Sequence, residues 1–288
     1  MTRSVKIVTD STADLPLSYY KKYDIEVVPL YIRFGTDIYK ENVELSNEDF
    51  YCKLNEYEKK GIPTTSQPSP QDFIDAYNKI KEDSIISIHI GSKLSGTCQS
   101  ANIAKGMLSD RDITVVDTGI VSAGLGMLVM TAAKAAKLGW NKEKILDLID
   151  NIRQQLRIYF TVETLKYLEK NGRIGRAQAL LGTILHIIPI LSFEEGVIVP
   201  VEKVRGSKRV LPKYKELISK TISPEEPIDA LLVQANCMDK AKKLEEMMRA
   251  NFNCKELTIC NVGGVVGSHA GPGTWGIAVC PSKLTAVK

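Results

Sequence analysis

The amino-acid sequence predicts a two-domain α/β protein, in which a doubly wound parallel sheet is followed by an α+β domain with a largely antiparallel sheet. In the first half, short apolar segments alternate with amphipathic helical segments, which is typical of a parallel sheet covered by helices on both faces. In the second half, two apolar segments are separated only by Glu194-Glu195-Gly196, which favours a β-hairpin. The 288 residues are enough for two domains.

The first half begins with a strand over residues 5–9, and the polar residues Asp10, Ser11 and Thr12 then favour the start of a helix. Further strands are expected over residues 25–34, 85–90 and 113–117. Helices are expected over residues 46–60, 72–81, 96–108, 122–138 and 142–155. Ser46 and Asp49 occupy the positions of a capping box, which supports a helix that begins there.

The pattern changes near residue 155, after which strands and helices no longer alternate regularly. The expected strands cover residues 157–163, 190–193, 197–204, 230–234, 257–262 and 276–280. The expected helices cover residues 165–171, 176–186, 213–221 and 240–252. We therefore place one domain at residues 1–155 and the other at residues 156–288.

Composition and charge exclude several classes of protein. Hydrophobic residues make up 44% of the chain and charged residues 25%, which excludes a disordered chain and a coiled-coil rod. The net charge of +4 is too small to predict nucleic-acid binding. The six cysteines form no CxxC pair and the three histidines are not at ligand spacing, so we expect neither disulfides nor a metal site. No segment has the pattern of a signal peptide or a membrane span, and we expect a soluble, cytoplasmic protein.

The first candidate binding site is a loop of small residues, 91–97, which follows the strand at 85–90 and opens the next helix. Ser95 and the amides of Gly96 and Thr97 then lie at a helix N-terminus, where unpaired N–H groups favour an anion. The alternative is that Ser95 serves only as the N-cap of the helix.

A second candidate loop, residues 61–70, contains three prolines and the hydroxyl side chains of Thr64 and Thr65. In a doubly wound sheet, the loops at the carboxyl ends of the strands gather at one crevice, so these hydroxyls can face Ser95. The alternative is that they only cap turns.

A third candidate loop, residues 263–273, is rich in glycine and contains His269. Glycine lets the backbone approach a ligand closely, although a purely structural role for His269 is equally consistent with the sequence. Residues 271–276 formally match GxGxxG, but a strand rather than a helix follows them, so a dinucleotide site is not expected. The chain contains no phosphate-binding loop of the GxxxxGK[ST] type.

Two other interpretations of these residues stay open. A serine hydrolase can use Ser95 as nucleophile and His269 as base, with Asp10 orienting the histidine. Lys93 stands where a GxSxG elbow has its first glycine, which argues against this hydrolase. Alternatively, His269 can accept a phosphoryl group as a carrier.

Five motifs, in order along essentially the whole chain, resemble those of the DegV family. They are TDSTADLP at 9–16, TTSQP at 64–68, LSGT at 94–97, NGRIGR at 171–176 and HAGPG at 269–273. Two positions differ from the family pattern. Cys98 stands where an aromatic residue is common, and His186-Ile187-Ile188 stands where a lysine often precedes Pro189.

The resemblance implies a fatty-acid-binding protein with its ligand at the interface of the two domains, and with no catalysis, metal or cofactor of its own. Family members present the carboxyl group of a long-chain, palmitate-like fatty acid to a separate ATP-dependent fatty acid kinase, which makes an acyl-phosphate for phospholipid synthesis. Transient membrane contact fits this role. A carboxyl group needs hydrogen-bond donors, and the residues expected to supply them are Thr64, Thr65, Ser95, Gly96 and His269. The uncharged segments 122–133 and 177–185 are candidate walls of the acyl pocket.

Docking of the kinase is expected on the second domain. Residues 166–215 hold ten basic and four acidic residues, a net charge of +6, whereas the rest of the chain carries −2. The resemblance assigns Arg205 and Arg173 to this docking. Nucleic acid is not expected as the partner, because the segment lacks the interleaved aromatic residues of a single-strand platform.

Overall fold

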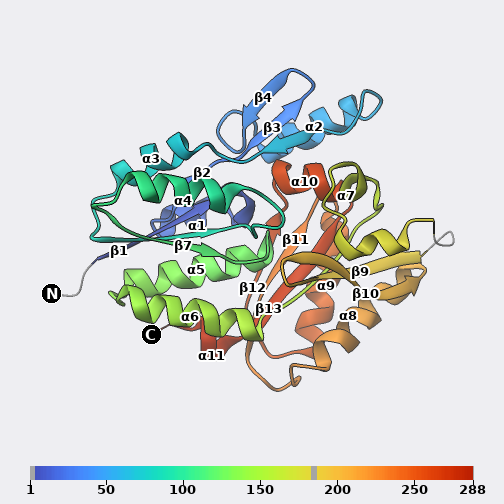
Figure 1. The fold of residues 1–288 in the computed structure, drawn as a ribbon. Helices are drawn as coiled ribbons and strands as arrows, with labels where there is room; N and C mark the ends of the chain where they lie inside the picture. Colours follow the sequence, from blue (N-terminus) through green and yellow to red (C-terminus); the bar gives the residue numbers. More distant parts are fainter. Residues whose placement is uncertain (1–3, 183–186, 288) are drawn as a thin grey trace.

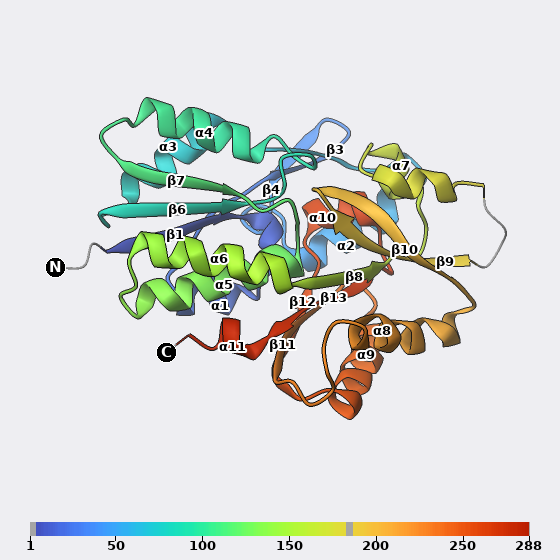
Figure 2. The same cartoon turned by 60° about the horizontal axis from the view of Figure 1, so that its bottom comes forward.

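The first sheet is parallel, and its strands follow the order β2-β1-β6-β7. It belongs to the blue-to-green part of the ribbon, in which β1, β2 and β7 are labelled (Figure 1). The computed structural model describes residues 4–182 and 187–287. The strands are β1 (Val5–Asp10), β2 (Glu26–Val28), β6 (Ser84–His89) and β7 (Asp112–Asp117). Helices α3 (Pro70–Lys79) and α4 (Thr97–Met107) cover one face, while α5 (Ala123–Lys137) and α6 (Lys142–Gln155) lie on the other (Figure 2). Side chains alternate accordingly, so that Val8 packs among α3 and α4 and Ile7 packs on the α5 side.

The second sheet is six-stranded, and its order is β10-β9-β8-β13-β11-β12. Its strands are β8 (Arg157–Thr161), β9 (Ile187–Glu194), β10 (Val197–Arg205), β11 (Ile228–Gln234), β12 (Cys254–Asn261) and β13 (Trp275–Pro281). All of its pairings are antiparallel except β11 with β12. Helices α8 (Val210–Ser219) and α9 (Met238–Asn251) pack on one face. The predicted fold class is therefore confirmed.

The hairpin of β9 and β10 turns at Glu195 and Gly196, which both have positive φ angles of 50° and 79°. A two-residue turn of this kind matches the twist of antiparallel strands, and glycine adopts it without strain.

Other short helices are α1 (Leu17–Lys22), α7 (Lys166–Lys170), α11 (Ser282–Thr285), η1 (Ser11–Ala13) and η3 (Ser207–Arg209).

Helix α5 joins the two halves of the molecule, because it contacts β1 and β6 on one side and β11 and β13 on the other. Twelve of its fifteen residues are buried. A helix that is covered on nearly all sides is apolar all round, which explains the long uncharged segment in the sequence. A Cβ on Gly124 would stand 2.4 Å from the Ile158 side chain, so glycine at this position lets α5 approach β8 closely.

A third sheet is small, antiparallel and ordered β4-β3-β5. It contains β3 (Tyr31–Phe34), β4 (Asp37–Lys40) and β5 (Thr64–Ser66), and it packs with α2 (Asn47–Tyr57) near α10 (Gly264–Ala270). The prediction of one strand over residues 25–34 is therefore wrong. The chain leaves the parallel sheet after Val28 and enters the small sheet at Tyr31, and Pro29 between them cannot donate to a strand ladder.

Two further predictions need correction. The expected helix at 176–186 is a short 3-10 helix, η2 (Gly175–Leu180), whose first residue has a φ of +55°; residues 183–186 lie outside the described residues. The glycine-rich segment 263–273, expected to be a loop, contains α10. A Cβ on Gly264 or Gly267 would come within 3 Å of Phe50, so these glycines allow close helix packing rather than an irregular loop.

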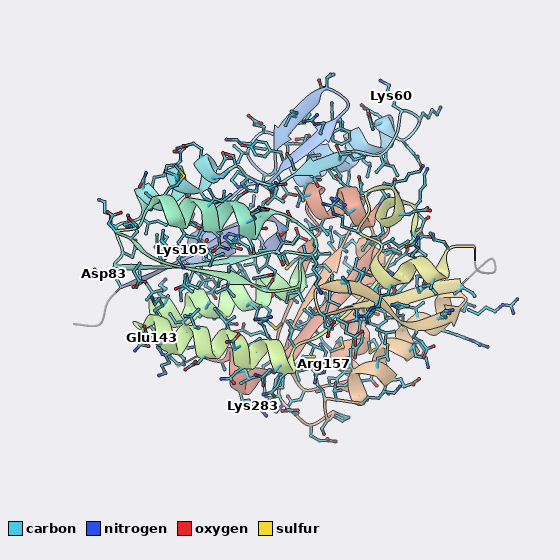
Figure 3. All side chains as sticks on the ribbon, in the orientation of Figure 1. Lys60, Asp83, Lys105, Glu143, Arg157 and Lys283 are labelled. Atoms are coloured by element: carbon cyan, nitrogen blue, oxygen red, sulfur yellow. The ribbon has the colours of Figure 1, made fainter. Side chains whose placement is uncertain are left out.

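Charged side chains surround this core. Lys60, Lys105, Glu143 and Lys283, for example, are exposed; they are labelled in Figure 3. Within the described ranges, no helix combines the length and the apolar character needed to cross a membrane.

Candidate functional site

A cavity lies between the two main sheets. On the side of the parallel sheet it is lined by Leu30, Ile90 and Val121, which follow the carboxyl ends of β2, β6 and β7. On the other side it is lined by residues of β8, β9, β11 and β13, among them Phe160, Phe193, Val233 and Ile277. The strand order reverses between β1 and β6, and in open α/β sheets ligands bind at such a point. Most of the lining is apolar.

Five polar residues of this lining belong to one cluster, which we call the polar cluster: Thr65, Gln67, Ser95, Arg173 and His269. Thr65 Oγ1 lies 2.7 Å from His269 Nε2. The guanidinium Nε of Arg173 donates to the carbonyl of Leu94, next to Ser95, at 3.0 Å. Gln67 stands beside Gly96, with its Nε2 3.1 Å from the place that a Cβ on this glycine would take. The cavity therefore has a polar end, and apolar residues make up most of its remainder.

Ser95 lies at the start of α4, as the sequence predicts. Its hydroxyl is 2.9 Å from Thr97 Oγ1. It is not the N-cap, since Gly96 occupies that position and offers no side chain. In the described part of the chain, the amides of Gly96 and Thr97 have no hydrogen-bond partner. An anion beside Ser95 therefore meets unpaired N–H groups at the positive end of a helix.

Thr64 and Thr65 are neighbours on β5, so their side chains lie on opposite faces of the strand. Thr65 points toward His269, whereas Thr64 is exposed and does not line the cavity. The expectation that Thr64 faces Ser95 is therefore not met, because neighbouring residues of a strand point to opposite faces. Gly96 likewise lies beside the lining rather than in it.

His269 is an uncharged hydrogen-bonding group at neutral pH. Burial of the ring, together with the positive charge of Arg173, lowers the pKa of His269 to about 4. Its Nε2 is engaged by Thr65, and its Nδ1 is buried without a partner among the described residues. A buried ring nitrogen without a partner costs free energy, which a ligand that binds to it recovers.

Arg173 lines the cavity, although the sequence suggested a docking role for it. Its Nη1 donates to the carbonyl of Asn171 at 2.7 Å. Asn171 in turn donates to the carbonyls of Pro63 and Ser268 at 3.2 and 2.8 Å. The NGRIGR motif thus ties the second half of the chain to the loops that carry Thr65 and Ser95. Arg205, by contrast, is exposed at the end of β10, away from the cavity.

Most cavity walls were not predicted. Two uncharged segments were expected to form walls of the cavity. From segment 122–133 only Ser122 and Ala123 line it, and no described residue of segment 177–185 does. Gln67 is a site residue that sequence reasoning did not single out, although it stands within the TTSQP motif. No group of three or more His, Cys, Asp or Glu side chains suited to a metal ion is found in residues 4–182 and 187–287.

The described residues Ser95, His269 and Asp10 do not form the triad of a serine hydrolase. Asp10, expected to orient His269, instead accepts from His89 Nδ1 at 2.9 Å and from the Ile90 amide at 3.0 Å. Asp10 and His89 are fully buried. His269 bonds to Thr65 and Ser95 bonds to Thr97, so the described contacts do not join a nucleophile, a base and an acid.

An apolar cavity between two sheets, with hydrogen-bond donors and one arginine at its end, is typical of the sites where proteins bind small molecules. The model of an uncharacterised protein family, DegV, matches residues 4–282. The chain belongs to the DegV family, as the five sequence motifs indicate.

Relatives in this family align over nearly the whole chain. A DegV domain-containing protein of Halalkalibacterium halodurans is 39% identical over 277 residues, which cover 95% of this chain and 97% of that protein. A Thermus thermophilus DegV family protein, described as binding fatty acid, is 34% identical and superposes with a TM-score of 0.90 over 96% of this chain and 99% of its own. DegV of Bacillus subtilis, described as a fatty acid binding protein, is 33% identical with a TM-score of 0.88 over 97% and 99% of the two chains.

Proposed function

We propose that this chain binds one long-chain fatty acid, such as palmitate. The acyl chain occupies the apolar part of the cavity, and the carboxyl group lies among Thr65, Ser95, Arg173 and His269. The observation that carries the proposal is the cavity itself, whose apolar lining ends at the polar cluster. The descriptions of the Thermus thermophilus and Bacillus subtilis relatives as fatty-acid-binding proteins support it.

The two parts of the cavity suit the two parts of a fatty acid. Burial contributes about 0.8 kcal/mol per methylene, so a chain of roughly sixteen carbons contributes on the order of 10 kcal/mol before ordering costs. Each hydrogen bond to the carboxylate contributes roughly 1.5–3 kcal/mol. Because His269 is neutral at pH 7, Arg173 supplies the positive charge at this end of the cavity.

The amide of Gly96 completes the set of donors in this proposal, since it is unpaired and adjacent to Ser95. Thr64 is left out, because its side chain is on the exposed face of β5. Thr64 and Thr65 therefore form a matched pair for a test on one strand.

Mass spectrometry of organic extracts from the purified protein tests the proposal, and we expect about one free fatty acid per chain. Thr65→Val removes a donor to the carboxylate and should weaken palmitate binding by roughly tenfold to a hundredfold. Thr64→Val is the control and should bind like the wild-type protein. Extracts without fatty acid after gentle purification, or equal affinities for the two variants, would contradict the proposal.

We further propose that the bound carboxyl group is presented to a separate ATP-dependent kinase, which converts it to an acyl-phosphate for phospholipid synthesis. The chain acts as a binding protein, because its sequence contains no phosphate-binding loop. Arg173 and Gln67 are exposed as well as lining the cavity, so the polar end faces the surface where a second protein can reach it. We place this exchange in the cytoplasm, where ATP is available, with brief membrane contact to load the ligand.

The kinase docks on the basic face of the second domain in this proposal. Arg205 is exposed at the end of β10, and Lys203, Lys208 and Arg209 near it are exposed as well. Charged groups at the rim of an interface act mostly on the association rate and are sensitive to salt. Arg173 contributes to docking only through its exposed part, since its guanidinium also lies against the ligand site.

A further inference from the structure

Two buried carboxyl groups, those of Asp14 and Glu41, meet at the start of α10. Asp14 Oδ1 accepts from the amide of Gly263 at 2.9 Å, and its Oδ2 accepts from the hydroxyl of Ser122 at 2.5 Å. Glu41 Oε1 accepts from the amide of Val265 at 2.7 Å. Asp14 is 6% exposed and Glu41 is 1% exposed. Acidic side chains are almost never this deeply buried unless they are paired.

The two carboxyl groups are close enough to influence each other. A Cβ on Gly263 would stand 2.5 Å from Glu41 Oε1 and 2.8 Å from Asp14 Oδ1. Burial raises the pKa of Asp14 well above its ordinary value, and the charge of Glu41 raises it further. Burial also raises the pKa of Glu41 to about 7. The other titratable groups that face the pair from its surroundings are Asp10 at the end of β1, Tyr20 of α1, Tyr51 of α2 and Cys260 of β12.

Glu41 holds the helix that carries His269. Val265 and His269 are four residues apart on α10, so they lie on the same side of the helix, one turn apart. Both line the cavity. The bond from the Val265 amide to Glu41 therefore fixes the turn that sets the distance between His269 and Thr65.

We propose that Asp14 and Glu41 are positioning residues: while one of the two keeps its proton, they hold the first turn of α10 and set His269 against the carboxyl group of the ligand. This inference rests on the proposed function. When the last proton is lost, two like charges remain side by side in a buried place. Glu41 Oε2 has no hydrogen-bond partner in the described part of the chain, so a second buried charge beside Asp14 is costly. The first turn of α10 loosens, and His269 moves away from the ligand.

The test measures palmitate affinity between pH 6 and pH 8.5 for the wild-type protein and for Glu41→Gln. Wild-type affinity should fall by about tenfold as the pH rises, which is within the usual range for coupled sites. The glutamine keeps an oxygen for the Val265 amide but has no proton to lose, so its affinity should stay constant. Glu41→Ala loses the acceptor and should bind weakly at every pH. Glu48→Gln changes an exposed carboxylate of α2 and should follow the wild-type curve.

A pH dependence of Glu41→Gln that matches the wild-type protein would overturn the inference. Asp14→Asn removes the charge of the other carboxyl group and provides a second test. Its palmitate affinity should likewise stay constant as the pH rises. The side-chain NMR signals of His269 in the protein without ligand give a separate readout. They should shift near pH 7 in the wild-type protein and not in Glu41→Gln. If wild-type protein binds no palmitate at any pH, the proposed function fails, while the NMR signals still decide the role of the pair.

Discussion

Glu41 and His269 should oppose each other in the pH dependence of folding stability. Burial raises the pKa of Glu41 from 4.5 to about 7, whereas burial lowers the pKa of His269 from 6.5 to about 4. At about 1.4 kcal/mol per pKa unit, each difference corresponds to roughly 3 kcal/mol of unfolding free energy. The two residues therefore contribute similar amounts with opposite signs.

The sign of each pH dependence follows from whether the folded or the unfolded state binds the proton more tightly. Glu41 binds its proton more tightly when folded, so its contribution is complete below pH 4.5 and is lost as the pH rises to about 7. His269 binds its proton more tightly when unfolded, so its contribution is complete above pH 6.5 and is lost as the pH falls to about 4. Between these limits the two trends offset each other in the wild-type protein.

Single substitutions should separate the two trends. Glu41→Gln removes the trend of Glu41, so the unfolding free energy of this variant, relative to the wild-type protein, should fall by roughly 3 kcal/mol between pH 7 and pH 4.5. His269→Gln removes the trend of His269, so the unfolding free energy of this variant, relative to the wild-type protein, should rise as the pH falls from 6.5 to 4. Urea unfolding at closely spaced pH values measures both, with Glu48→Gln as the control. A constant difference between wild-type and Glu41→Gln stability from pH 4 to pH 7.5 would refute the reasoning.

Three further outcomes are expected. Gly263→Ala should lower the unfolding free energy by about 1–3 kcal/mol, because the added methyl group would clash with the carboxyl groups of Asp14 and Glu41. The backbone itself would accept alanine, since the φ of Gly263 is −67°. Gly106→Ala, in open space on α4, should instead raise it by up to about 1 kcal/mol; urea unfolding compares the two. Arg173→Met should weaken palmitate binding by roughly tenfold to a hundredfold in a direct titration, whereas Arg176→Met should not. Arg205→Ala should bind palmitate normally yet slow acyl-phosphate formation by the cognate kinase; a full rate at physiological salt would remove it from the docking surface.

The fold was predictable where the pattern of residues is local. Strands such as β6 and β7 and the helices between them repeat clear apolar periods, and the hairpin of β9 and β10 is bounded by a two-residue turn. Helix α10 was not predictable, since Gly264 and Gly267 are needed only because Phe50 packs there from a distant part of the chain. Propensity disfavours glycine in a helix, and tertiary packing outweighs it here.

The site was predictable as a set of motifs but not as a geometry. The choice between Thr64 and Thr65 depends on the face of β5, and a three-residue strand has too little alternation to show its inward side. The position of Arg173 depends on a bond to the Leu94 carbonyl, which belongs to the other half of the chain. Wall residues such as Phe160 resemble ordinary core residues in the sequence.

The division of the cavity into a long apolar part and a small polar cluster decides how binding free energy is distributed. The acyl chain contributes on the order of 10 kcal/mol, and a single head-group contact contributes roughly 1.5–3 kcal/mol. Loss of Thr65 or Ser95 should therefore weaken binding without abolishing it. In the proposed function the head group fixes the orientation of the ligand, because the polar cluster gathers several donors and the positive charge of Arg173 at one end of the cavity. We therefore infer that the proposed ligand is held by its tail, which leaves the carboxyl group where a second protein can reach it.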